Sequence, residues 1–172
     1  PEAVADGARL ALGMVRGELV GVPLDQATGL SMGLQPADAI LEDGGKSARL
    51  LVPPKELGGS LLLMGCDPAL GLLGAQVLRL LPSARVHSRF ASSQTAWSAL
   101  ARGEAHVAGT HFHGGAGSGR DANVAAARQA MSGTPCRVMG FSFMEEGLIT
   151  ARGNPLGIRE AADLAGGARF LN

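Results

Sequence analysis

The feature that most limits the fold is an alternation of strand-like and helix-like segments that begins at Ser60. Residues 60–64 are an almost continuous apolar run, which suits a strand buried on both faces of a parallel sheet. Residues 69–81 follow with apolar side chains at helical spacing. Further strands are expected at residues 84–88 and 105–109, and further helices at residues 94–101 and 122–131. The alternation predicts an α/β fold with a parallel-type sheet flanked by helices.

The segment before Ser60 has a different character. Residues 9–15 and 18–22 are typical of two strands joined by a tight turn at Arg16-Gly17. A short helix is expected at residues 36–41 and a strand at residues 50–52. We therefore predict an N-terminal β-containing arm or linker over residues 1–59 and a ligand-binding domain over residues 60–172. The end of that domain is expected to hold strands at residues 138–143, 147–151 and 168–171 and a short helix at residues 159–164.

The charge balance excludes several classes of partner. Lys and Arg together number 15, as do Asp and Glu, whereas binding to nucleic acid needs a basic surface. The same balance argues against a basic helix on a membrane surface, and no apolar run reaches the roughly 18 residues of a membrane span. Cys66 and Cys136 lack a CxxC spacing, and no signal peptide is apparent. We expect a cytoplasmic chain that binds neither nucleic acid nor membrane itself.

Polar and small residues follow three of the expected strands. In an open parallel sheet, ligands bind where the carboxyl ends of strands lead into helices. Backbone amides at a helix N-terminus carry partial positive charge, and hydroxyl groups add donors without adding charge. The pattern therefore predicts a site for an anion or a polar small molecule. Its candidate residues are Gly65, Cys66 and Asp67, then Ser92 and Ser93, and finally Thr110 and His111.

Simpler roles compete with binding at most of these positions. Ser92 and Ser93 fit as caps of the second helix, since serine is a preferred cap. Asp67 is expected to cap the first helix, with its carboxylate turned toward the helix amides and away from any anion. Cys66 is equally consistent with a small buried side chain. Thr110 and His111 favour function more strongly, because a polar pair after a buried strand is costly unless it is used or exposed.

Other kinds of chemistry have weaker support. His111 and His113 would lie on one face of a strand, but no third metal ligand has suitable spacing. The glycine-rich segment 114–119 lacks the lysine of a phosphate-binding loop and the spacing of a dinucleotide-binding turn. Glu145-Glu146 could supply a general base but fits a solvated turn better. We expect no metal, no cofactor and no enzyme activity.

Several stretches together resemble a known family. They are residues 61–73 (LLLMGCDPALGLL), 93–100 (SQTAWSAL), 103–111 (GEAHVAGTH), Asn123, 145–155 (EEGLITARGNP) and 168–172 (ARFLN). With these stretches, about residues 60–172 are similar to the periplasmic-binding-protein-like domain of bacterial helix-turn-helix and molybdenum-dependent transcription regulators. This domain also occurs in some molybdopterin-biosynthesis proteins. It resembles the type II substrate-binding proteins that hold molybdate, tungstate and similar oxyanions.

The resemblance implies two α/β lobes that close on a ligand. Contacts in the first lobe would come from the candidate residues above, and Asn123 matches a position where the family often has a polar Asn. The family usually has Gly where this chain has Ala96, which affects how closely the second helix can approach a ligand. The family also continues beyond the position of Asn172 with a basic segment of the second lobe, so the domain is expected to be truncated. A DNA-binding domain would then precede Pro1.

Three hypotheses about function follow. The first is a sensor domain for a small ligand, most consistently an oxyanion such as molybdate. The second is a domain of a molybdopterin-biosynthesis enzyme, in which Glu145 and Glu146 would matter. The third is a purely structural or oligomerising module, in which Ser93 and Thr110 would matter only for stability. A truncated domain with one complete lobe could also form a homo-oligomer through its exposed half-core.

Overall fold

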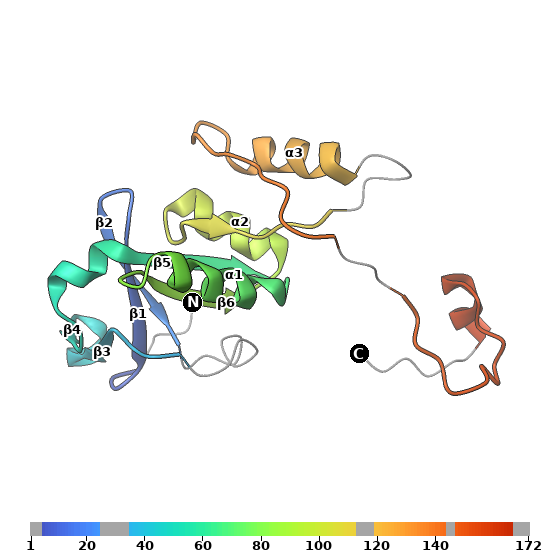
Figure 1. Ribbon diagram of the computed structural model, residues 1–172, viewed down its shortest axis with the longest axis horizontal. Coiled ribbons are helices and arrows are strands. Elements are labelled where there is room, and N and C mark those ends of the chain that lie inside the picture. Colours follow the sequence, from blue (N-terminus) through green and yellow to red (C-terminus); the bar gives the residue numbers. More distant parts are fainter. Residues whose placement is uncertain (1–4, 25–34, 113–118, 144–146, 167–172) are drawn as a thin grey trace. The chain divides into compact units, whose positions relative to one another are not determined.

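The computed structural model describes residues 5–24, 35–112, 119–143 and 147–166. The chain divides into two compact units, Pro1–Met139 and Gly140–Asn172. The first unit contains a four-stranded antiparallel sheet and a three-stranded parallel sheet (Figure 1). The mixed α/β class expected from the sequence is therefore confirmed. No helix in the described part of the chain is both long and apolar enough to cross a membrane.

The antiparallel sheet is formed entirely by residues before Gly59. Its strand order is β2-β1-β3-β4, with β1 Arg9–Val15, β2 Glu18–Pro23, β3 Ala39–Glu42 and β4 Ser47–Leu50. The first two strands lie within one residue of their predicted bounds. Arg16 and Gly17 join them with positive φ angles of 53° and 86°. Two positive φ angles are the requirement of a type I′ hairpin turn, which confirms the expected tight turn.

The parallel sheet confirms the alternation that begins at Ser60. Its strand order is β6-β5-β7, so β5 is the central strand. Gly103 ends the second helix in the left-handed conformation, with a φ of 77°, as glycine commonly does. The strands are β5 Ser60–Gly65, β6 Arg85–Phe90 and β7 Val107–Ala108, and the helices are α1 Ala69–Leu80, α2 Ser93–Arg102 and α3 Gly119–Ala130.

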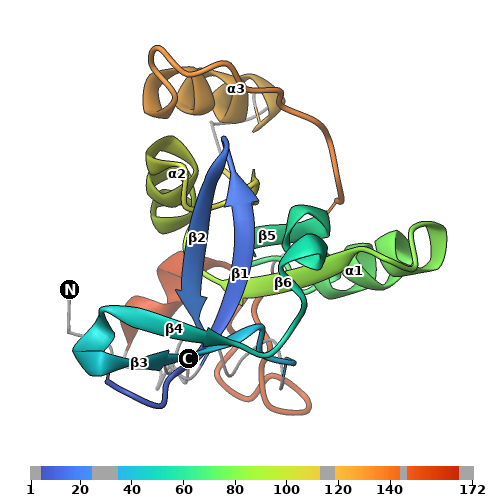
Figure 2. The same cartoon turned by 90° about the vertical axis from the view of Figure 1, so that its left-hand side faces the viewer.

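The two faces of β5 pack against different parts of the first unit. Leu62 packs with side chains of β1, and Met64 packs with buried alanines of α2. Leu61 points to the opposite face and is paired in register with Val86. Val86 approaches Gly74 of α1, where an added Cβ would lie 3.2 Å from the valine Cγ1. Hairpin β1–β2 and helix α2 therefore share one face of the sheet, while α1 covers the other (Figure 2).

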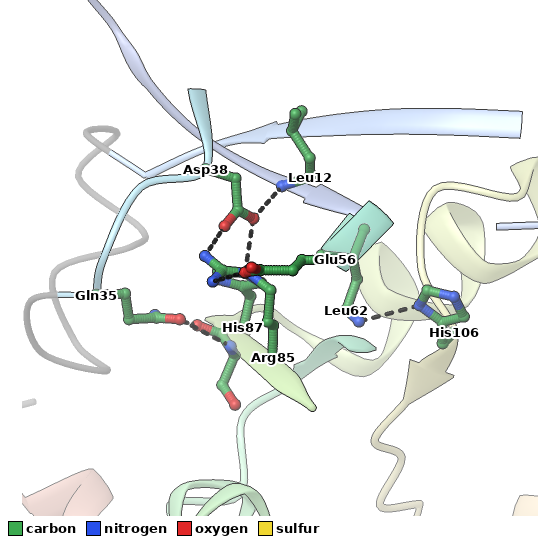
Figure 3. Close-up of polar contacts among 9 residues, drawn as sticks. Leu12, Gln35, Asp38, Glu56, Leu62, Arg85, His87 and His106 are labelled. Carbon is green, nitrogen blue, oxygen red and sulfur yellow. Dashed lines mark hydrogen bonds and ion pairs between the residues drawn. The ribbon is translucent and has the colours of Figure 1, made fainter. Parts of the chain in front are cut away.

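A buried polar junction connects the two sheets. We use this name for Asp38, Arg85 and His87, drawn in Figure 3. The Asp38 carboxylate is fully buried and accepts a hydrogen bond of 2.7 Å from the backbone N–H of Leu12 in β1. It also pairs with the Arg85 guanidinium, and its Oδ2 lies 2.8 Å from Nε2 of His87. Because Arg85 and His87 belong to β6, one carboxylate fastens the antiparallel sheet to the edge of the parallel sheet.

Two more side chains strengthen this connection. His106 Nδ1 accepts a hydrogen bond from the backbone N–H of Leu62 at 3.0 Å, so its Nε2 carries the hydrogen that bonds the Met14 carbonyl at 2.9 Å. Gln35 bonds both backbone groups of Ser88, at 2.6 and 3.0 Å, on the open edge of β6 (Figure 3). His106 thus bonds backbone groups of β5 and β1, and Gln35 joins the segment before β3 to the edge strand β6.

Several expectations about secondary structure are wrong. The short helix expected at residues 36–41 is instead strand β3, because Asp38 and Leu41 donate their backbone N–H groups to carbonyls of β1 and the residue before it. The strand expected at residues 50–52 lies earlier, as β4, and ends at Leu50. The helix expected at residues 159–164 is a 3₁₀ turn over Ala161–Gly166.

The strands expected at residues 138–143 and 147–151 are also wrong. Neither segment pairs with another strand among the residues described, and Phe143 and Ile149 are fully exposed. A β-strand needs a neighbour for its backbone groups, so apolar composition alone does not produce one. The strand expected at residues 168–171 lies outside the described residues. The change of sheet type coincides with the boundary expected after residue 59, but the division into arm and binding domain stays a prediction.

The buried junction predicts a pH-dependent stability. Burial lowers the pKa of His87 below its ordinary value of 6.5; the Asp38 carboxylate opposes this shift, and the Arg85 charge adds to it. The unfolded chain therefore takes up a proton at this imidazole more readily than the folded chain. We expect the free energy of unfolding to fall as the pH drops below about 6.5. In His87→Gln, part of this pH dependence should disappear, as measured by urea unfolding at a series of pH values.

The control for this measurement is a variant that is destabilised but keeps His87. Leu63→Val shortens a fully buried side chain of β5 and should lower stability while retaining the slope of the parent protein. An unchanged slope in His87→Gln would show that this imidazole does not contribute.

Candidate functional site

The carboxyl ends of β5 and β7 come unusually close to each other. A Cβ added to Gly65 would lie 2.8 Å from Cδ1 of Leu70 and 3.1 Å from the Cα of Gly109. The Gly109 N–H donates to the Met64 carbonyl at 2.7 Å, which continues the pairing of the two strands to this point. Only glycine fits such a contact. The residues that follow, Cys66 on one strand and Thr110 on the other, therefore leave the sheet side by side.

Three predicted site residues form a connected group at this edge. The Cys66 Sγ lies 3.3 Å from Nδ1 of His111. The backbone N–H of His111 donates to the Ser93 hydroxyl at 3.3 Å. Ser93 is buried and is the first residue of α2. Because a hydroxyl group can both accept and donate, its oxygen accepts this bond while its O–H hydrogen can still donate.

A second group of predicted residues ties α3 to the end of β7. The Thr110 hydroxyl donates to the side-chain oxygen of Asn123 at 2.9 Å. The Asn123 amide nitrogen in turn donates to the carbonyl oxygen of Phe112 at 3.1 Å. Helices α2 and α3 pack together, and Figure 1 shows α3 beside α2 and β7. The structure thus brings Cys66, Ser93, Thr110, His111 and Asn123 to one edge of the parallel sheet, although their role in binding stays a prediction.

Ser92 caps α2, and Asp67 bonds the first amide of α1. The Ser92 hydroxyl accepts the backbone N–H of Thr95 at 3.2 Å, as the capping alternative requires. An Asp67 carboxylate oxygen accepts the backbone N–H of Ala69 at 2.8 Å. The Asp67 charge is therefore directed at the start of α1. Ala96, which departs from the family pattern, is fully buried in the core of α2, and its side chain faces Met64.

An aromatic pair that the sequence analysis did not predict lies beside these residues. Trp97 stacks on Phe112 with ring centroids 4.8 Å apart and ring planes 13° from parallel. Trp97 lies one helical turn after Ser93, so the two share a face of α2, and Phe112 follows His111 directly. That spacing could have placed the tryptophan near the site. As the only tryptophan of the chain, it reports on this edge of the sheet.

Some candidate residues fall outside the description. His113, the segment 114–118 and the pair Glu145-Glu146 lie outside the described residues. Across the described ranges, no group of three or more His, Cys, Asp or Glu side chains is placed to hold a metal ion. His87 and His106, which have no metal-ligand spacing, serve the contact between the two sheets.

Comparison with known proteins identifies the family. Residues 75–172 match the model of a family described as the PBP superfamily domain. The chain belongs to the PBP superfamily. Membership confirms the periplasmic-binding-protein-like part of the resemblance and indicates a ligand-binding role. The match begins within α1, so it includes Ser93, Thr110 and Asn123 but not the turn after β5. No curated protein and no solved structure matches the chain.

The glycine contact between β5 and β7 predicts a sharp difference between two substitutions. In Gly65→Ala, the new Cβ would press on Leu70 and on the backbone of Gly109, which should cost about 1–3 kcal/mol of unfolding free energy. In Gly71→Ala, the Cβ meets nothing within 4 Å on an exposed position of α1, and helix propensity should stabilise the protein by up to about 1 kcal/mol. Urea unfolding measures both. Equal effects of the two substitutions would contradict the close approach.

Proposed function

We propose that this chain carries the ligand-sensing domain of a bacterial transcription regulator, that it acts in the cytoplasm without catalysis, and that its ligand is an oxyanion such as molybdate. The observation that carries the proposal is the convergence of neutral hydrogen-bonding groups at one edge of the parallel sheet. Ser93 and Thr110 come from different elements; Ser93 is hydrogen-bonded to His111 and Thr110 to Asn123, and the two pairs meet because Thr110 and His111 are neighbours in the chain. Membership of the PBP superfamily supports binding of a small ligand at such an edge.

The chemistry of this edge favours an anion over a cation. The first backbone amides of a helix have no partner within the helix, and α2 begins at Ser93 itself. Ser92 already accepts the amides of Thr95 and Ala96, so the donors at this end of α2 are the amides of Ser93 and Gln94 and the Ser93 O–H. These groups carry no full charge and suit an oxyanion. Asp67, the one carboxylate among the candidate residues, is engaged with the amide of Ala69.

The parent regulator would bind DNA through another part of the protein. The balanced charge of this chain gives no basic surface for DNA, so the proposal places DNA binding outside it. The DNA-binding domain would therefore belong to the longer protein that the family resemblance implies.

Trp97 allows a direct test of ligand binding. Titration of the chain with molybdate, tungstate, sulfate and phosphate should change the tryptophan fluorescence for at least one of them, because Trp97 stacks on the residue after His111. Ser93→Ala should weaken that binding about tenfold or more, since a hydrogen bond to a charged group contributes about 1.5–3 kcal/mol. Ser98→Ala, five residues along the same helix, is the matched control and should bind like the parent protein.

Stability must be measured beside binding. Loss of a serine hydroxyl near a helix start can itself lower stability by about 1 kcal/mol, so each variant is unfolded in urea as well. Absence of a fluorescence change with all four anions, confirmed by calorimetry at millimolar concentration, would contradict an oxyanion ligand. Equal affinity of Ser93→Ala and the parent would remove Ser93 from the site.

A further inference from the structure

A thiol and an imidazole lie in contact where β5 and β7 leave the sheet. The Cys66 Sγ is 3.3 Å from Nδ1 of His111, within hydrogen-bond distance for sulfur. A nucleophile beside a base is the arrangement that activates thiols in proteins. The pair is not needed at the start of α1, because Asp67 accepts the amide of Ala69 there.

The fold holds the pair in place from both sides. Met64 and Ala108 are paired in register, and the close approach of Gly65 and Gly109 carries the two chains onward together. The backbone N–H of His111 is bonded to the Ser93 hydroxyl, which restricts where the imidazole can lie. The sheet and the bond to Ser93 therefore fix the backbone positions from which the Cys66 and His111 side chains meet.

Solvent reaches this pair. Cys66 is half-buried and His111 is exposed, so the pair lies at the surface of the protein. The chain also contains Cys136, which is free and exposed. Exposure alone would make Cys136 the more reactive thiol. A comparison of the reaction rates of the two cysteines therefore distinguishes the effect of solvent access from the effect of the neighbouring base.

We propose that Cys66 is a thiol modification site, at which His111 acts as the base and a small-molecule disulfide is the reactant. Nδ1 of His111 takes the proton of the Cys66 thiol as the sulfur attacks one sulfur of the disulfide. A new S–S bond forms between Cys66 and that half of the reagent, and the S–S bond of the reagent breaks. The other half leaves as a thiolate and takes the proton from His111. One thiol and one disulfide thus become one mixed disulfide and one thiol.

The surrounding charges act in both directions. The start of α1 lies three residues after Cys66, and the positive end of a helix favours a negative sulfur nearby. The Asp67 carboxylate opposes this effect, although it is bonded to the Ala69 amide. The imidazole is therefore the group on which the reactivity depends, and its removal is the decisive change. This inference concerns the thiol alone and stands whether or not the site binds an oxyanion.

The test compares the two cysteines of one chain. The protein is treated with oxidised glutathione at neutral pH, and peptide mass mapping follows the mixed disulfide at each cysteine over time. Cys66 should react faster than the exposed Cys136. His111→Asn should lower the rate of mixed-disulfide formation at Cys66 at least about tenfold. This is a cautious figure, since a general base usually contributes about a hundredfold or more. The rate at Cys136 should stay unchanged.

A second measurement covers the case in which the variant folds poorly. In urea-unfolded parent protein, where the contact with His111 is lost, the advantage of Cys66 over Cys136 should disappear. The proposal is overturned if folded Cys66 reacts no faster than Cys136, if His111→Asn keeps the parent rate at Cys66, or if the advantage of Cys66 persists in urea.

Discussion

The carboxylate of Asp38 is the group on which the arrangement of the first unit depends. It is fully buried, and a buried charge is tolerated only when donors satisfy it. Here the Leu12 amide of the antiparallel sheet and the Arg85 guanidinium of the parallel sheet donate to it, and Nε2 of His87 lies 2.8 Å from it. Removing one partner of such a buried pair typically costs about 3–5 kcal/mol. The carboxylate therefore fixes how β1 and β6 meet.

The antiparallel sheet also contacts the helix that carries Ser93 of the candidate site. Hairpin β1–β2 and α2 share one face of β5, and the hairpin turn also holds α2, because the Arg16 guanidinium donates to the carbonyls of Leu100 and Ala101. Such a contact suits the negative end of a helix. The antiparallel sheet thus holds the C-terminal end of α2. The N-terminal end of α2 carries Ser93 and faces the ends of β5 and β7, where the thiol, hydroxyl and amide groups lie.

The sequence predicted the parallel sheet well because each strand and helix there has its own local signal. The run at β5, the cap at Ser92 and the stop at Gly103 all act within a few residues. The buried junction could not be predicted, because Asp38 and His87 are brought together by tertiary contacts across 49 positions of the chain. The same limit explains the error at β3, whose partners lie in β1. The place of Trp97 beside the candidate site could have been predicted, because it lies one helical turn after Ser93.

The account places ligand binding at the carboxyl ends of the parallel strands, and backbone amide NMR tests that claim most directly. Uniformly ¹⁵N-labelled chain would be titrated with molybdate, tungstate and sulfate in turn. The account predicts shifts of the amide signals of Cys66, Ser93, Thr110 and His111, with the signals of β3 and β4 unchanged. Shifts confined to the antiparallel sheet, or no shifts at the four amides with any of the three anions, would contradict it.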